Sequence, residues 1–375
     1  MPGHEHPIEW RGRKVNAWVP DPLTEHNLTL TEPTTRRTER AAAAARRGSD
    51  ALPADGGALA RLLLRSEGVA SSYVEGVQAP LAQVVAAELD PRVGESAAWI
   101  ADNAAATQTA IEQAREAPLD METLHRWHRR LMSGASHLPD HQIGAWRDLP
   151  GWIGGTSPLD AAAVVPPPEL IEPLTSDLVE FANRTDTDPV TQAAVAHAQF
   201  ELIHPYADGN GRVGRILIAW VLTRRLNLAN PPPVSVRIAT DRGGYLSGLT
   251  LFRLGQVDPW VAWFAEIVEG SGDAATNLLG AIATLTADWS ERIAGVRADA
   301  VAHRVLALLP AYPVIGGEIV AEELGVSERA ARTALDTLQD HRILEPFAPA
   351  HREAGRPRRW WVATELLALV SAWSR

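Results

Sequence analysis

The segment 212–226 constrains the fold most, because it has helical spacing and is apolar nearly all round. A surface helix carries one apolar stripe, whereas a helix that is apolar on all sides must be buried among other helices. We therefore expect a helical bundle with this segment in its middle. Hydrophobic residues make up 46% of the 375-residue chain, which is enough apolar material for a sizeable core.

Apolar periodicity and Gly or Pro breaks predict further helices on both sides of this segment. They fall at 39–47, 58–73, 81–89, 95–116, 119–132, 166–183, 189–203, 244–254, 259–268 and 274–297. Gly, Pro and Ser punctuate 133–168, and a short hairpin is expected at 151–155. Residues 1–32 are expected to form an irregular, partly extended arm on the surface.

From about residue 298 the pattern changes. Two helical segments, 319–324 and 327–339, flank Gly325, and Ser327 suits the N-cap of the second. This order is typical of a helix-turn-helix. Segments 342–347 and 358–362 are expected to be two strands of a wing, joined by a loop that contains Arg352, Gly355 and Arg356.

Composition excludes several classes of protein. The chain has no cysteine, so disulfides, thiolate zinc sites and cysteine nucleophiles are excluded. Its only lysine, Lys14, has no glycine-rich loop beside it, which excludes a P-loop and a protein-kinase site. A net charge of −11 argues against coating nucleic acid or membrane with the whole surface. No apolar run is long enough to span a membrane, and residues 1–6 are polar and lack the apolar region of a signal peptide. We therefore expect a cytoplasmic protein without a membrane partner.

The segment 204–215, HPYADGNGRVGR, combines the groups that phosphate chemistry needs. A helix N-terminus presents unpaired N–H groups and the positive end of a dipole, which together bind phosphate. Gly209 and Gly211 let backbone amides approach an anion without an intervening Cβ. Arg212 and Arg215 add positive charge with several donors each.

Two more side chains complete this chemistry. Asp208 offers an oxygen ligand to Mg²⁺, which needs few protein ligands when phosphates supply the rest. His204 titrates near neutral pH and suits a general base. The glycines also match a dinucleotide-binding pattern, but that pattern requires a preceding strand and an acidic residue about 20 positions further on. The preceding segment is helical and no acid lies between Asp208 and Asp241, so we exclude a nicotinamide site.

The segment resembles the signature of the Fic family, H-P-F-x-[DE]-G-N-G-R-x-x-R, with Tyr206 in place of Phe. Segment 197–204 resembles the family's central helix, Arg147 with 152–155 resembles its flap, and Tyr245 with 258–260 resembles its later helices. The resemblance covers roughly residues 5–270 and implies a mainly α Fic bundle with a short β-hairpin flap, followed here by a C-terminal winged-helix domain.

The family resemblance implies a protein adenylyltransferase, which moves AMP from ATP to a Tyr, Ser or Thr hydroxyl of a target protein or of itself. His204 would deprotonate that hydroxyl, and Asp208 would hold Mg²⁺, or Mn²⁺ in its place, against the phosphates. The ATP-binding residues carried over are Gly209, Asn210, Gly211, Arg212, Arg215 and Tyr245. The flap residues Trp152, Ile153, Gly154 and Gly155 would pair with an extended target segment. The phosphorylating relative Doc has lysine where Gly211 stands, so AMP transfer is favoured.

The segment 71–76 resembles the family's inhibitory motif, [ST]-x-x-x-E-[GN], with Ser71, Glu75 and Gly76 at its defined positions. By that resemblance Glu75 would pair with Arg215 and occupy the place of the γ-phosphate. A carboxylate there also repels a triphosphate. In some family members the same glutamate supports removal of AMP, and that alternative stays open.

We accordingly divide the chain into an N-terminal arm with an inhibitory helical region (1–95), a Fic core (96–272), a connecting helix (273–297) and a winged helix-turn-helix (298–375). Two other functions stay open: a nucleotide-sensing DNA-binding regulator with weak or no transferase activity, and a kinase-like variant. Residues 301–375 have nine arginines and nine acidic residues, so this part has no basic excess, and DNA binding, a protein contact and a homodimer all stay open.

Overall fold

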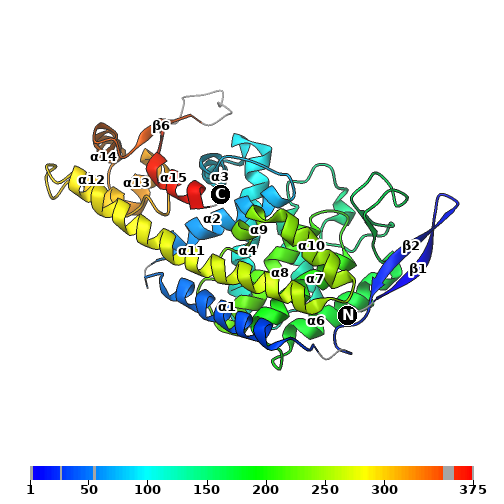
Figure 1. Cartoon of the computed structure of the whole chain (residues 1–375). Helices are drawn as coiled ribbons and strands as arrows, with labels where there is room; N and C mark the ends of the chain where they lie inside the picture. Colours follow the sequence, from blue (N-terminus) through cyan, green and yellow to red (C-terminus); the bar gives the residue numbers. More distant parts are fainter. Residues whose placement is uncertain (1–2, 26–27, 54–55, 349–358, 374–375) are drawn as a thin grey trace.

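The computed structural model describes residues 3–25, 28–53, 56–348 and 359–373. Helix α8 (Asn210–Leu226) lies in the middle of a helical bundle (Figure 1) and packs against α4 (Glu95–Glu116) and α7 (Pro189–Ile203). Every residue of α8 except Arg224 and Arg225 is buried. The expectation of a central buried helix is confirmed.

Most of the other helices begin and end within a few residues of the expected positions. They are α2 (Gly57–Val74), α3 (Leu81–Leu89), α5 (Met121–Leu131), α6 (Ile171–Asn183) and α10 (Arg242–Arg253). Helix α1 (Glu32–Asp50) contains the expected 39–47 but begins much earlier in the chain. Helix α9 (Val234–Thr240) was not expected, because the three prolines before it indicated only a break. Proline also suits the residues that lead into a helix, where its missing N–H leaves no bond unmade.

The two helices expected at 259–268 and 274–297 are in fact one helix, α11 (Val257–Arg292). We expected the glycines near residue 270 to break it. Instead, a Cβ on Gly272 would lie 2.4 Å from the carbonyl oxygen of Ala44 in α1, and one on Gly48 would lie 2.9 Å from the Gly272 oxygen. These glycines let α1 and α11 pack backbone against backbone along their length (Figure 1).

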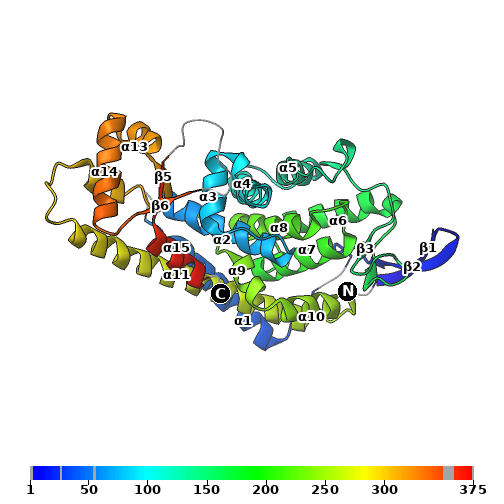
Figure 2. The same ribbon diagram turned by 90° about the horizontal axis from the view of Figure 1, so that it is seen from above.

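The expected irregular N-terminal arm is wrong over its first half. Strands β1 (Gly3–Trp10) and β2 (Arg13–Pro20) form an antiparallel hairpin that projects from the bundle (Figure 2). Its two turn residues, Arg11 and Gly12, have positive φ of 48° and 76°, the conformation that matches the twist of paired strands. Alternation of apolar residues at 15, 17 and 19 was the signal that sequence inspection passed over.

The short hairpin expected within 151–155 is confirmed only in its first strand, β3 (Trp152–Ile153), because the partner strand β4 (Ala163–Val164) lies further along the chain. Gly154 and Gly155 follow β3 with φ of 69° and 70°, values that L side chains rarely adopt. We call the two strands and their connection, residues 151–165, the flap.

The C-terminal elements are α12 (Val301–Leu306), β5 (Val314–Gly316), α13 (Gly317–Leu324), α14 (Glu328–Asp340), β6 (Glu345–Phe347), β7 (Trp360–Val362) and α15 (Thr364–Trp373). The helix pair is confirmed, since Gly325 turns the chain with φ of 63° and the Ser327 hydroxyl caps α14. The strands form an antiparallel sheet in the order β5-β7-β6. The loop expected to carry Arg352, Gly355 and Arg356 lies outside the described residues.

These C-terminal elements share a core with the bundle. Leu62 and Leu63 of α2 join a buried cluster with Trp289 of α11 and Trp361 of β7. Helix α3 packs on β5 and α15, and Figure 2 shows β5 beside α3. Within the described residues, no helix is long and apolar enough to cross a bilayer. The division into domains stays a prediction, and α11 runs through the proposed boundary at 272 without a break.

Candidate active site

The loop between α7 and α8 is tied at both ends. His204 ends α7 in the left-handed conformation, with φ of 50°, and Gly209 precedes α8 with φ of 78°. The buried Asn210 side chain accepts a hydrogen bond from Tyr206 N and donates one to Tyr206 O, both at 2.8 Å. Asn210 therefore braces the loop with its side chain and leaves only its backbone N–H for an anion.

His204 is anchored through its backbone, so that its ring stays available. Arg147 donates from Nε to the His204 carbonyl at 2.8 Å and from its backbone N to Pro205 O at 2.9 Å. The buried Nδ1 of His204 has no hydrogen-bond partner among the described residues. Burial and the nearby Arg147 charge lower the pKa of His204 to about 4. The ring is therefore neutral at pH 7 and can accept a proton.

Asp208 presents a charged carboxylate in the same loop. One oxygen accepts from Gly209 N at 2.6 Å, and the other lies 2.9 Å from His137 Nε2 and 3.8 Å from Arg212. Burial acts to raise the pKa of Asp208, but these donors and charges outweigh it and lower the pKa. No group of three or more His, Asp or Glu that could hold a metal lies among the described residues. A cation bound at Asp208 would take most of its ligands from phosphates and water.

Two buried arginines of α8 lie beyond the loop. Arg212 is 5% exposed, and its only protein hydrogen bond is to Met132 Sδ at 3.5 Å; its Nε has no partner in the described structure. A buried guanidinium without acceptors costs free energy. The arrangement therefore suits an anionic ligand that supplies the missing acceptors.

Arg215 is fully buried and already has an anion beside it. It donates from Nε to Ser71 Oγ and from Nη2 to Ser71 O, both at 2.9 Å, and from Nη2 to Glu75 Oε1 at 2.6 Å. Glu75 follows the end of α2, and Gly76 beyond it has φ of 84°, as expected for a residue that ends a helix. The segment 71–76 thus lies against the signature segment, in agreement with the sequence interpretation.

The Glu75 carboxylate also lies over the backbone of Gly211, since a Cβ there would be 2.0 Å from Glu75 Oε1. Burial acts to raise the pKa of Glu75, but the Arg215 charge and hydrogen bond, followed by the Arg212 charge, outweigh it and lower the pKa. The carboxylate therefore sits charged among the cations and over the glycine that the sequence assigned to phosphate.

Two further buried residues, Tyr245 and Glu201, lie close enough to Arg215 to affect its pKa. Tyr245 is buried, and its hydroxyl lies 2.9 Å from His197 Nε2. His197 is a hydrogen-bonded core residue, as expected, and burial lowers its pKa to about 3. Burial, and the Glu75 charge after it, raise the pKa of Glu201 to about 8. The role of Tyr245 in nucleotide binding stays a prediction.

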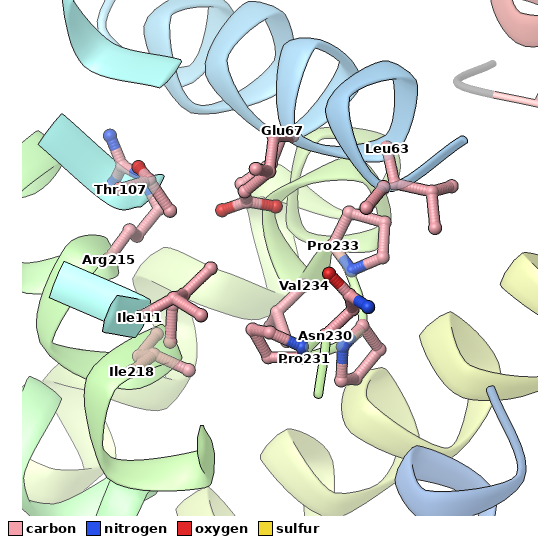
Figure 3. A pocket seen from close by; sticks show the side chains of 14 residues that line it. Leu63, Glu67, Thr107, Ile111, Arg215, Ile218, Asn230, Pro231, Pro233 and Val234 are labelled. Carbon is pink, nitrogen blue, oxygen red and sulfur yellow. The ribbon is translucent and has the colours of Figure 1, made fainter. Parts of the chain in front are cut away.

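Helix α2 is held on its other side as well. Figure 3 shows a small, mostly apolar pocket in which Glu67 of α2 and Arg215 lie near Ile111 and Pro231. Ser235 of α9 donates to Glu67 from its backbone N at 2.8 Å and from its hydroxyl. Burial raises the pKa of Glu67 to about 7. These bonds to α9 hold the helix that carries Glu75.

Two side chains at the site, His137 and Glu201, were not singled out from the sequence, and Arg147 was assigned to the flap rather than to the loop before α8. His137 contacts Asp208, Glu201 lies behind Arg215, and Arg147 anchors the loop. Glu201 stands three residues before His204 in an apolar helix, which was a usable signal. His137 lies in an irregular segment, where the sequence does not indicate which way a side chain points.

Comparison with known proteins places this site in a family. Residues 118–222 match the Fic/DOC family. The protein adenylyltransferase fic-1 of Caenorhabditis elegans is 29% identical over 156 residues, which are 41% of this chain and 28% of that protein. The protein adenylyltransferase Fic of Drosophila sechellia is 29% identical over 202 residues, 51% of this chain and 38% of that protein. The chain thus spans only 28% and 38% of the length of these two relatives.

Solved structures show the same fold. A Fic family protein from Desulfovibrio desulfuricans G20 superposes with a TM-score of 0.55 at 22% identity, covering 90% of this chain and 97% of that one. Fic-1 from C. elegans superposes with a TM-score of 0.52 at 20% identity, covering 67% and 74%. The chain therefore contains a Fic domain and is homologous, over part of its length, to Fic protein adenylyltransferases.

Proposed function

We propose that this protein is an autoinhibited adenylyltransferase that moves AMP from ATP to a hydroxyl side chain of a target protein or of itself. The observation that carries the proposal is a loop that begins at the neutral His204 and leads into α8, whose first turns carry the buried Arg212 and Arg215. The Nε of Arg212 has no hydrogen-bond partner among the described residues. The homologues named protein adenylyltransferase support the same chemistry.

In the proposed reaction, His204 takes the proton of the target hydroxyl as that oxygen bonds to the α-phosphorus. The bond from the α-phosphorus to the bridging oxygen breaks, and pyrophosphate leaves. Arg212, the amides at the start of α8 and Arg215 would hold the phosphate charge. Asp208 would hold Mg²⁺ or Mn²⁺, which neutralises phosphate charge when bound.

We also propose that Glu75 inhibits AMP transfer, and we call this residue the brake. It forms a salt bridge with Arg215 and fills the space over Gly211, where we place a phosphate. ATP and the Glu75 carboxylate would compete for the same cations, and the like charges would repel. Removing Glu75 should therefore raise AMP transfer.

The test uses ATP labelled on either the α- or the γ-phosphate, incubated with wild type, Glu75→Gly and Glu75→Gly/His204→Ala. We expect the α-label to enter protein, more in Glu75→Gly than in wild type, and to fall roughly 100-fold or more without the base. Glu116→Gly, at the exposed end of α4, is the matched control and should behave as wild type. Transfer of the γ-label would mean phosphorylation, and no label in folded Glu75→Gly would favour a nucleotide sensor.

We further propose that the C-terminal elements form a winged helix-turn-helix that serves protein contacts rather than DNA. Arg332 of α14 pairs with Glu328 at 2.8 Å, and Arg359 beside β7 pairs with Asp336 at 3.0 Å. These pairs reduce the positive charge that DNA would meet. A shift of duplex DNA at low salt would contradict this assignment, because phosphate contacts are strongest there.

A further inference from the structure

The N-terminal hairpin extends the flap. Trp10, at the end of β1, packs edge-on against Trp152 of β3 with ring centroids 6.4 Å apart, and β2 contacts β4. Figure 2 shows the hairpin next to β3. The chain after β2 is anchored on the bundle, since Gln199 of α7 donates to Asp21 O at 2.9 Å and Leu23 N donates to Asp177 at 2.5 Å. The hairpin is therefore a fixed neighbour of the surface that we expect to meet the target.

The tip of the hairpin is basic in an acidic protein. Arg11, Arg13 and Lys14 are exposed, and none of them forms an ion pair within the described parts of the chain. Glu9 lies opposite Lys14 in the strand register and offsets one of the three charges. The Arg11 guanidinium lies 4.6 Å from the Trp10 ring, which keeps it on the side chain that contacts the flap. The net charge of the whole chain is −11, so this local excess has the opposite sign.

Apolar side chains are exposed at the flap itself. Leu149 just before it is 63% exposed, and Leu159 within it is 47% exposed. At physiological salt, charges act over about 8 Å, so the basic tip influences only a chain that runs close to it. A segment lying on the flap satisfies that condition.

Building on the proposed transferase function, we propose that the hairpin tip and the flap together bind an extended target segment that carries acidic residues near the modified hydroxyl. The flap would pair with the backbone of the target segment and make apolar contacts with it, and the basic tip would favour segments that carry negative charge. A nucleic acid fits less well, because the Trp10 ring is covered by Trp152 and Arg11 and is not free to stack on a base.

The test uses three synthetic peptides with a central tyrosine, flanked by glutamate, by glutamine or by lysine. The enzyme is Glu75→Gly, with and without Arg11→Glu/Arg13→Glu. We expect α-label to enter the glutamate peptide roughly tenfold faster than the lysine peptide at low salt, the effect of about 1.4 kcal/mol. The double variant should abolish or reverse this preference, and high salt should shrink it.

Arg46→Glu/Arg329→Glu is the matched control, because it changes the charge equally at exposed arginines on α1 and α14. It should keep the preference for the glutamate peptide. Binding of fluorescent peptides to His204→Ala, measured by anisotropy, gives a readout that needs no catalysis.

The outcomes separate the two proposals. If no protein or peptide takes α-label, the transferase proposal fails, while charge-dependent peptide binding can still be measured. If all three peptides are labelled and bound equally, or if the Arg11→Glu/Arg13→Glu variant keeps the preference, the hairpin inference fails. Tip-dependent binding of a single-stranded oligonucleotide without binding of the glutamate peptide would also overturn it.

Discussion

Gly211 borders the space that Glu75 occupies in the proposed inhibited state and that a phosphate would occupy in the proposed active state. Its missing side chain leaves a space that Glu75 Oε1 fills, 2.0 Å from the position of a Cβ. The same space would belong to phosphate once Glu75 leaves. An alanine there should therefore harm the protein in two separable ways.

Gly211→Ala should lower stability by about 1–3 kcal/mol in the wild type, because a methyl group overpacks the contact with Glu75. In the Glu75→Gly background most of this stability cost should vanish, while ATP affinity should stay low because the methyl group still blocks the phosphate. Thermal unfolding and ATP titration of the four proteins measure the two effects. Equal stability costs in both backgrounds would show that Glu75 is not the group that fills this space.

Single residues differ in how far sequence could place them. Ser71, Glu75 and Arg215 were placed together from their motifs, and the structure brings them into hydrogen-bond contact. Glu201 and His137 were missed as site residues because their roles depend on neighbours far apart in the chain. A motif describes a local backbone, whereas a buried acid acquires its protonation state from the whole surrounding packing.

At the scale of elements, α11 shows that glycine in a helical sequence has two opposite structural interpretations. Glycine in a helical pattern indicates either a break or a close approach of another backbone. Gly272 is the second case, because α1 lies directly against it. Helices with clear caps and periodicity were predicted well, but only the tertiary neighbour could decide this one.

Two of the three glycines of α11, Gly272 and Gly280, make a matched pair for a stability measurement. Gly272→Ala should destabilise the protein by about 1–3 kcal/mol, because the new Cβ meets the Ala44 carbonyl at 2.4 Å. Gly280→Ala on the same helix should stabilise it by about 0.5–1 kcal/mol, because nothing lies within 4 Å and alanine favours the helix. Denaturant unfolding of both variants checks the signs. A stabilising Gly272→Ala would contradict the close packing of α1 and α11.

At the scale of the molecule, the C-terminal elements hold the helix that carries the proposed brake. Arg65 of α2 is buried and donates to both carboxylate oxygens of Glu88, at 2.8 and 2.7 Å, and to Ala311 O at 2.7 Å. Leu62 and Leu63 join the C-terminal core from the same helix. Helix α2 is therefore packed between the Fic domain and the C-terminal elements.

Arg65→Met should loosen α2 and leave Glu88 and the Ala311 carbonyl without their donor. We expect faster amide exchange in α2 and a several-fold rise in α-label transfer by the otherwise wild-type protein. The same substitution in Glu75→Gly should add little, because the brake is already gone. Arg46→Met on α1 is the exposed control. Unchanged transfer together with faster exchange would show that α2 can loosen without releasing Glu75.

The position of α2 between two units has a thermodynamic corollary. We propose that ATP binds more tightly when α2 has shifted and Glu75 has left Arg215. Any molecule that binds the C-terminal elements more tightly in the same shifted state then raises the affinity of the proposed site for ATP. Reciprocity then requires the nucleotide to alter that molecule's affinity by the same factor.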